Sequence, residues 1–317
     1  MKITVLDTNT VTNGDLSLKA IEQFGEVSYY DMLSEDGIIE ASKTSDIIIC
    51  NKSEITNRIM ENCKNLRFIT LFATGYNNID LKAAQKYGIT VSNAPGYSTD
   101  SVAQHTFALI LELAESLSSY TSSVKRGDWT RQEKFCYFSY PLSELAGKTL
   151  GIIGFGAIGR RVSRLARAFS MEVLCNARSE KSAEGVRYCT KEEIFRKSDY
   201  ITLHCPLNDE TRGLINEKTI ALMKPTVRII NTSRGAVIDE KALCQALNSE
   251  RIAGAAVDVL EKEPMPKNHP YLTAKNIIVT PHIAWATDEA RQRLIQLVCK
   301  NLEGFKNGKP INVVSAE

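Results

Sequence analysis

Three side chains that could together transfer a proton lie in the second half of the chain. Arg234 lies in the segment NTSRG, Glu263 in DVLEKEP and His282 in TPHIAW, and each segment follows a short apolar stretch that predicts a buried strand. A histidine can give or take a proton near neutral pH, and a carboxylate bonded to it orients the ring and stabilises its charged form. An arginine binds a carboxylate through two parallel hydrogen bonds. These residue types predict proton transfer on a substrate that carries a carboxylate.

A glycine-rich turn precedes these segments and indicates a dinucleotide site. In GIIGFGAIGR at 151–160, the pattern GxGxxG comes between a predicted strand and a predicted helix, which is the context that makes it informative. The glycines would allow a tight turn and a close approach to a diphosphate, which the N–H groups at the start of the helix would bind. The residues of this turn are Gly154, Gly156, Ala157, Ile158 and Gly159.

Together the turn and the three side chains define a reaction. Reduction of a 2-keto acid needs a hydride, a proton for the carbonyl oxygen and a cation for the carboxylate. A nicotinamide dinucleotide would supply the hydride, His282 the proton and Arg234 the cation, while Glu263 steadies the histidine. We therefore expect an oxidoreductase that interconverts a 2-keto acid and a 2-hydroxy acid.

The strand after the glycine turn bears on the choice of cofactor. An Asp or Glu about 20 residues past the turn would bind the ribose 2′-OH of NAD. Here that position falls on Ala177 and is followed by Arg178 and Ser179, which can hydrogen-bond a 2′-phosphate. The sequence favours NADP(H), and the alternative is NAD(H) bound through Asn176 or Glu180.

The composition excludes several other classes of protein. The 39 Lys and Arg residues balance 37 Asp and Glu residues, so the net charge of +2 offers no general attraction for nucleic acid or an anionic membrane. No stretch approaches the ~18 apolar residues of a membrane span, and the N-terminus does not read as a signal peptide. The eight cysteines and four histidines lack the paired spacing of a metal site. We expect a cytoplasmic protein with reduced thiols, no metal, and neither nucleic-acid nor membrane partners.

Apolar runs alternate with amphipathic stretches along nearly the whole chain, which predicts an α/β fold with mainly parallel sheets. Turn residues interrupt the pattern at PGYSTD, residues 95–100, and a second series of strands and helices follows. The last predicted helix is long enough to return to the first series. We expect two doubly wound parallel-sheet domains. A flavodoxin-like substrate domain of residues 1–98 and 288–317 would hold an inserted Rossmann-type dinucleotide-binding domain of residues 99–287.

More specific predictions apply to three segments of the chain. Residues 16–24 have helical spacing, and one long helix is predicted from about 101 to 120. The segment 125–140 is irregular, aromatic and charged. It would either cover a partner's surface or pack on its own chain.

The motifs together resemble those of the D-isomer-specific 2-hydroxyacid dehydrogenases, and the resemblance covers essentially the whole chain. Its segments are PGYSTDSVAQHTFALIL at 95–111, GIIGFGAIGR at 151–160, LHCPLNDETRGLIN at 203–216, NTSRG at 231–235, DVLEKEP at 258–264 and PHIAWAT at 281–287. Within the family, the opening LDTNTVTNGDLS and the stretch FCYFSYPLSELAGKTLGI are most similar to bacterial glycerate dehydrogenases, also called hydroxypyruvate reductases.

The resemblance implies roles for individual residues. It makes Arg234 the substrate-binding arginine, Glu263 the glutamate that orients the histidine, and His282 the general acid and base. Backbone N–H groups of the substrate loop, which comprises Ala73, Thr74, Gly75 and Tyr76, would hold the substrate carboxylate. Further cofactor contacts would come from Cys205, Pro206, Thr211, Thr232 and Asp258.

The resemblance also implies a substrate and an assembly. Hydroxypyruvate or glyoxylate would be reduced to D-glycerate or glycolate, and the protein would be a homodimer that contacts its partner through the long helix and the 125–140 segment. Two alternatives stay open. The first is a D-lactate dehydrogenase or another 2-keto acid reductase, and the second is a dinucleotide-sensing, corepressor-like binding protein.

Overall fold

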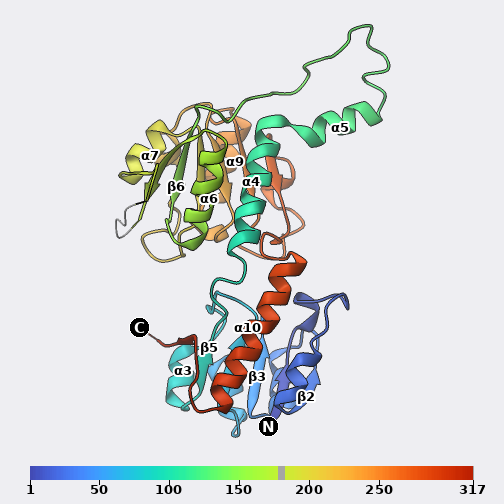
Figure 1. Ribbon diagram of the computed structural model, residues 1–317, viewed down its shortest axis with the longest axis vertical. Helices are drawn as coiled ribbons and strands as arrows, with labels where there is room; N and C mark the ends of the chain where they lie inside the picture. Colours follow the sequence, from blue (N-terminus) through green and yellow to red (C-terminus); the bar gives the residue numbers. More distant parts are fainter. Residues whose placement is uncertain (178–182, 317) are drawn as a thin grey trace. The chain divides into compact units, whose positions relative to one another are not determined.

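The computed structural model describes residues 1–177 and 183–316 and divides the chain into two compact units (Figure 1). The terminal unit comprises Met1–Ser98 and Ala286–Glu317, and the central unit comprises Thr99–Trp285. Each unit is a sheet with helices on both faces, because its strands are apolar on both sides and need cover on both.

The terminal unit contains a six-stranded sheet in the order β13-β5-β4-β3-β1-β2. All neighbours are parallel except β13, which runs antiparallel to β5. Without β13, this is the strand order of flavodoxin-like doubly wound sheets. The strands are β1 (Lys2–Val5), β2 (Glu26–Tyr29), β3 (Ile47–Cys50), β4 (Phe68–Leu71), β5 (Thr90–Ser92) and β13 (Val313–Val314).

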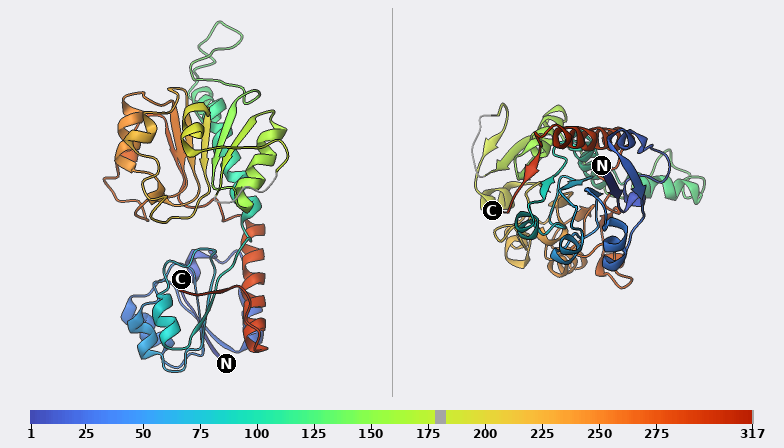
Figure 2. Two further views of the ribbon diagram at one scale, coloured as in Figure 1. Left: turned by 90° about the vertical axis from the view of Figure 1, so that its left-hand side faces the viewer. Right: turned by 90° about the horizontal axis from the view of Figure 1, so that it is seen from below.

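Helices cover this sheet on both faces (Figure 2). Alternate residues of β4 show the two layers. Ile69 and Leu71 lie in the core beneath α1, α2 and α3, while Phe68 stacks on Phe305 of α10 with ring centroids 4.4 Å apart. The helical elements of this unit are η1 (Thr8–Thr10), η2 (Lys19–Phe24), α1 (Glu35–Ser42), α2 (Asn57–Asn62), α3 (Leu81–Lys86) and α10 (Asp288–Lys306).

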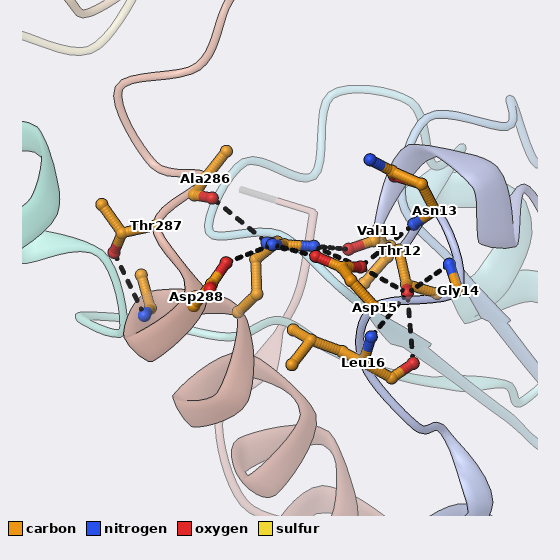
Figure 3. Close-up of polar contacts among 11 residues, drawn as sticks. Val11, Thr12, Asn13, Gly14, Asp15, Leu16, Ala286, Thr287 and Asp288 are labelled. Carbon is orange, nitrogen blue, oxygen red and sulfur yellow. Dashed lines mark hydrogen bonds and ion pairs between the residues drawn. The ribbon is translucent and has the colours of Figure 1, made fainter.

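A half-buried arginine, Arg291, connects the start of α10 to the loop after β1, whose residues are labelled in Figure 3. The Arg291 side chain is only 11% exposed, and its two terminal nitrogens lie 3.0 and 2.6 Å from the carboxylate oxygens of Asp15. The same guanidinium also bonds to the Asp288 carboxylate at 2.6 Å and to the Ala286 carbonyl at 3.1 Å. The hydrogen bonds from Arg291 hold the pKa of Asp15 well below its usual range.

The central unit contains a seven-stranded parallel sheet in the order β12-β11-β10-β9-β6-β7-β8. Counted from β6, this is the 3-2-1-4-5-6 order of dinucleotide-binding sheets, extended by one strand. The strands are β6 (Thr149–Ile153), β7 (Glu172–Asn176), β8 (Arg187–Tyr188), β9 (Tyr200–Leu203), β10 (Arg228–Asn231), β11 (Gly254–Val257) and β12 (Ile277–Val279).

Helices cover both faces of the central sheet (Figure 2), and a separate hydrophobic core lies on each face. Ile152 of β6 packs in the core with α4 and α6, and its neighbour Ile153 packs in the core with α7, α8 and α9. This alternation is the period of two that a strand imposes on its side chains. The helical elements here are α4 (Thr99–Glu115), α5 (Leu117–Lys125), α6 (Ala157–Ala168), α7 (Lys191–Lys197), α8 (Glu217–Ile220), η3 (Gly235–Val237), α9 (Glu240–Asn248) and η4 (Pro270–Leu272).

The predicted fold class is confirmed: two doubly wound parallel-sheet units, with a Rossmann-type unit inserted in a flavodoxin-like one. Two element predictions were wrong. The single helix over 101–120 is broken at Ser116, whose φ of 50° is left-handed and whose hydroxyl donates to the Pro141 carbonyl at 2.9 Å. The expected helix over 16–24 is reduced to the 3₁₀ segment η2, because the Thr12 hydroxyl accepts the Leu16 N–H and holds that residue in a turn.

Within residues 1–177 and 183–316, no helix combines the length and the apolar character that a membrane crossing requires. In the same residues, no group of three or more His, Cys, Asp or Glu side chains could hold a metal ion. No disulfide joins the eight cysteines, all of which lie within the described residues.

Candidate active site

A histidine and a glutamate from neighbouring strand ends form the most distinctive pair in the central unit. His282 follows β12 and Glu263 follows β11, and His282 Nδ1 lies 2.6 Å from Glu263 Oε2. His282 adopts a φ of 56°, a region that non-glycine residues rarely occupy, so the surrounding loop imposes its conformation. The carboxylate favours the proton on Nδ1, which leaves Nε2 as the ring nitrogen that can exchange a proton with a substrate.

The second oxygen of Glu263 is also engaged. Its Oε1 accepts the backbone N–H of Leu260 at 2.9 Å. The carboxylate is therefore fixed at both oxygens, although its side chain is 34% exposed and that of His282 is 27% exposed. This arrangement keeps the carboxylate against the imidazole and fixes the orientation of the ring.

Asp258 organises the loop that carries His282. It is 1% exposed, and its oxygens accept the Thr280 hydroxyl at 2.5 Å and the backbone N–H groups of Ile283 and Ala284 at 2.9 and 2.8 Å. Sequence reasoning missed the contribution of His105 of α4, whose Nε2 lies 3.1 Å from Thr280 Oγ1 and 3.6 Å from Asp258 Oδ1. The only sequence signal for it is a polar ring on an otherwise apolar helix face.

Arg234 follows β10, the strand next to β11 in the same sheet. Asn231 shapes this turn: its side chain accepts the Ser233 N–H at 3.0 Å and donates to the Arg234 carbonyl at 2.9 Å. The half-buried Arg234 guanidinium donates to the Ser233 carbonyl at 2.7 Å. Thr232 lies beside α4, with its hydroxyl 3.1 Å from that of Thr106. The structure thus brings His282 and Glu263 into direct contact and places Arg234 at the end of the adjoining strand.

The glycine turn after β6 has the shape that a dinucleotide requires. Gly154 has a φ of +95°, and a Cβ there would collide with the backbone of His204 and Cys205. A Cβ on Gly159 would strike the Gly154 carbonyl, whereas Gly156 faces open space. No side chain in the described part of the chain caps the start of α6 at Gly156. The first N–H groups of α6, from the exposed Ala157 onward, therefore fit a diphosphate.

The remaining proposed cofactor positions follow β7 and β9. Cys205 is buried and Pro206 is exposed, while the Thr211 hydroxyl donates to the Pro206 carbonyl at 2.6 Å and holds the turn between them. Ala177 is half-buried at the end of β7, and Asn176 donates to the Cys189 carbonyl at 2.9 Å. Arg178, Ser179 and Glu180 lie outside the described residues.

A second histidine in this region is unsuited to proton transfer. His204 lies beside the glycine turn with its Nε2 2.8 Å from the Thr202 hydroxyl, while its Nδ1 is buried. Loss of solvent on burial lowers the pKa of His204 to about 3. His204 is therefore neutral at physiological pH, which leaves the carboxylate-backed His282 as the candidate acid.

In the terminal unit, the substrate loop Ala73–Tyr76 follows β4. The Thr74 hydroxyl donates to the Ala94 carbonyl at 2.8 Å, and Asn93 Nδ2 donates to the Thr74 carbonyl at 2.7 Å. These bonds fix the loop through its carbonyl and hydroxyl groups. Across residues 1–177 and 183–316, the N–H groups of Thr74, Gly75 and Tyr76 have no backbone or side-chain acceptor. They remain available as donors to an anion.

Comparisons with known proteins agree with this geometry. Residues 107–284 match the family model described as "D-isomer specific 2-hydroxyacid dehydrogenase, NAD binding domain". The chain is 42% identical to a hydroxypyruvate reductase of Blautia hydrogenotrophica over 99% of this chain and 100% of that protein. It is 38% identical to a glyoxylate reductase of Pyrococcus furiosus, covering 100% of this chain and 96% of that protein.

Among solved structures, an acyclic imino acid reductase in complex with NADPH and D-Arg is 32% identical and superimposes with a TM-score of 0.88, covering 99% of this chain and 100% of that one. The family that the sequence motifs indicated is thereby confirmed. The chain belongs to the D-isomer-specific 2-hydroxyacid dehydrogenases and is an NAD(P)-dependent oxidoreductase of that family.

Proposed function

We propose that this enzyme reduces small 2-keto acids, with hydroxypyruvate and glyoxylate as its best substrates, and forms D-glycerate and glycolate. The observation that carries the proposal is the 2.6 Å contact between His282 Nδ1 and Glu263 Oε2. Both residues lie at the carboxyl-end edge of the central sheet, where Arg234 follows the adjoining strand. The printed activities of two relatives, hydroxypyruvate reductase and glyoxylate reductase, support the choice of substrate.

In the proposed mechanism, the bound nicotinamide cofactor supplies the hydride. Arg234 pairs with the substrate carboxylate, and the N–H groups of the substrate loop Ala73–Tyr76 also serve that carboxylate. His282 gives the proton on Nε2 to the carbonyl oxygen as the alkoxide forms. Glu263 stabilises the imidazolium beforehand, since it lies 2.6 Å from Nδ1. In the reverse direction neutral His282 takes the proton back.

We propose that residues 99–287 bind the cofactor and that residues 1–98 and 288–317 form the substrate domain. The diphosphate would lie on the open start of α6, where Gly156 leaves space. Asp258 and Thr232, at the ends of β11 and β10, would meet the nicotinamide. The proposed cofactor contacts are Gly154, Gly156, Ala157, Ile158, Gly159, Arg178, Ser179, Cys205, Pro206, Thr211, Thr232 and Asp258.

For the cofactor itself we favour NADP(H) over NAD(H). Ala177 directly follows β7, where a carboxylate would select NAD, and the Asn176 amide nitrogen is already bonded to the Cys189 carbonyl. An Ala177→Asp variant tests this preference. A carboxylate at position 177 should repel the 2′-phosphate and shift the ratio of kcat/KM values toward NADH. A wild-type enzyme that already prefers NADH would contradict the proposal.

We also propose a homodimer in the cytoplasm. The segment after α5 exposes large apolar side chains, with Phe135 92% exposed and Phe138 78% exposed, and Figure 1 shows it as a long loop. A second copy of the chain would cover this surface. Cysteines that form no disulfide suit a reducing compartment. Light scattering on the purified enzyme tests the assembly, and a monomeric mass would contradict it.

A panel of keto acids assayed with NADPH and with NADH tests the central proposal. We expect the highest kcat/KM with hydroxypyruvate or glyoxylate, because polar Tyr76 in the substrate loop and Asn77 directly after it suit a short, hydroxylated substrate. Faster turnover of pyruvate or a branched keto acid would reassign the substrate. Cofactor binding without turnover of any keto acid would contradict the proposed chemistry.

A further inference from the structure

A carboxylate outside the proposed catalytic set forms a hydrogen bond with the loop that carries Glu263. Glu240 is the first residue of α9, and its Oε1 accepts the backbone N–H of Glu261 at 2.9 Å. Its Oε2 lies 2.9 Å from Nε2 of His269. The helix does not need Glu240 as its cap, because Asp239 already accepts the N–H groups of Lys241 and Ala242 at 3.0 and 3.1 Å. Both Glu240 oxygens are thus committed to partners outside α9.

The tautomer of His269 follows from its other contact. Its Nδ1 accepts the backbone N–H of Tyr271 at 3.2 Å, so the ring proton lies on Nε2 and is donated to Glu240. The imidazole is only 5% exposed and the Glu240 side chain 15%. Tyr271, Cys244 and Asp239 are titratable groups close to this pair. Glu240 therefore accepts two hydrogen bonds from two defined donors in a largely buried setting.

The peptide between Leu260 and Glu261 connects this contact to the proposed catalytic pair. The N–H of Leu260 is donated to Glu263, and the next N–H along the chain, from Glu261, is donated to Glu240. Gly235 packs against the same peptide so closely that a Cβ there would collide with it. Gly235 directly follows Arg234, so this one peptide is in contact with the turns that carry both Arg234 and Glu263.

We propose that Glu240 is a positioning residue for the reaction: by holding the Leu260–Glu261 peptide, it fixes the Glu263 carboxylate against His282. This inference rests on the proposed roles of Glu263 and His282. With the peptide released, Leu260 would hold Glu263 less firmly and the carboxylate would spend less time beside the ring. The negative charge of Glu263 would then lie beside the ring for less of the time, so we expect the pH profile of reduction to change.

Glu240→Gln tests this because an amide cannot satisfy both donors. Gln has one acceptor oxygen and one NH₂ group, so either the Glu261 N–H or the His269 Nε2–H would face another donor. Glu240→Asp is a second variant that keeps the charge and the acidic start of α9, but its shorter side chain cannot bridge both partners. Glu261→Gln is the matched control. It removes one negative charge from the loop that Glu240 contacts, at a side chain that is 61% exposed, and leaves the backbone N–H of residue 261 intact.

The measurement is the pH dependence of kcat/KM for keto-acid reduction, with Glu263→Gln as the reference. Reduction needs protonated His282, so its rate falls along an alkaline limb. We expect Glu240→Gln to move this limb to lower pH by about half a unit or more and to lower kcat roughly tenfold, with Glu240→Asp giving a smaller shift in the same direction. Glu261→Gln should leave the limb in place, and the cofactor Kd should stay within about twofold of wild type in all three variants.

The outcomes separate two failures. If Glu263→Gln itself leaves the limb unmoved, the proposed role of Glu263 is wrong. If Glu263→Gln moves the limb but the folded Glu240 variants do not, Glu240 has no positioning role and the inference is overturned. A shift in Glu261→Gln equal to that in Glu240→Gln would also overturn it, because loop charge alone would then explain the effect. Should Glu240→Gln fail to fold, Glu240→Asp decides the question by the same criterion.

Discussion

Gly235→Ala is the smallest change that should disturb the proposed site without touching a reacting group. A Cβ at this position would approach the Leu260 carbonyl carbon, the Leu260 oxygen and the Glu261 nitrogen, and all three contacts would fall below 3.0 Å. Non-bonded carbon atoms rest at ~3.5–4.0 Å, so the Leu260–Glu261 peptide would have to move by roughly 1 Å or more. The neighbours are backbone atoms, which cannot swing aside as a side chain could.

Two consequences of that movement can be measured. The 2.9 Å bond from the Leu260 N–H to Glu263 would be lost, which leaves the carboxylate beside His282 unsupported. A misplacement of about 1 Å can reduce turnover by about 10²-fold. Overpacking of this kind costs about 1–3 kcal/mol of stability, equivalent to a fall in Tm of roughly 2–12 °C for a domain of this size.

The assay follows oxidation of the reduced cofactor with hydroxypyruvate, together with thermal unfolding and a fluorescence titration for the cofactor Kd. We expect kcat to fall strongly while the cofactor Kd changes little, since Gly235 is not part of the glycine turn after β6. Gly37→Ala in α1 is the control for a glycine-to-alanine change in the terminal unit, and its kcat should match wild type. A folded Gly235→Ala enzyme with kcat within about twofold of wild type and an unchanged Tm would refute the reasoning.

Three further predictions follow from particular side chains. His204 is neutral in the folded protein because loss of solvent lowers its pKa from the ordinary value of 6.5 to about 3. The unfolded chain therefore takes up a proton below pH 6.5 and stability falls by up to ~1.4 kcal/mol per pH unit there. This slope should be shallower in His204→Asn, and equal slopes would argue against a buried neutral ring. Arg291→Gln should lower Tm by a constant amount above pH 3.8, the ordinary pKa of Asp15, and by less at more acid pH, because the depressed pKa of Asp15 confines the loss of the ion pair to that range. A Tm difference that disappears already at neutral pH would contradict this. Arg234→Lys should lower kcat/KM for the keto acid by about 10–100-fold through a raised KM, since an ammonium offers a point charge in place of a planar fork. An unaltered KM would remove Arg234 from carboxylate binding.

The layered fold could be predicted from the sequence because buried parallel strands form short apolar runs. The runs before Arg234, Glu263 and His282 are β10, β11 and β12, which are neighbours in one sheet. Since the carboxyl ends of parallel strands share an edge, the grouping of these side chains follows from strand order alone. The glycine turn could also be predicted, because Gly154 and Gly159 each lie where a Cβ would collide with backbone atoms, while Gly156 leaves open space.

Other features depend on contacts between residues distant in sequence. Glu240 lies 21 residues before the Glu261 N–H that it accepts, and the path of the intervening loop decides whether they meet. Helical periodicity could not reveal the break at Ser116, which is set by a bond to Pro141 25 residues away. Likewise, the turn before η2 forms because the Thr12 hydroxyl accepts a backbone N–H that a helix would otherwise use. The apolar spacing of residues 16–24 gives no sign of this contact.

The rate of hydride transfer in a single turnover of His282→Gln tests the central claim most directly. His282 is the proposed proton donor, held by Glu263 at 2.6 Å. Its replacement should slow reduction of hydroxypyruvate by about 10²–10⁴-fold, while the cofactor Kd stays within about twofold of wild type. A His282→Gln enzyme that binds cofactor normally and transfers hydride at the wild-type rate would contradict the account.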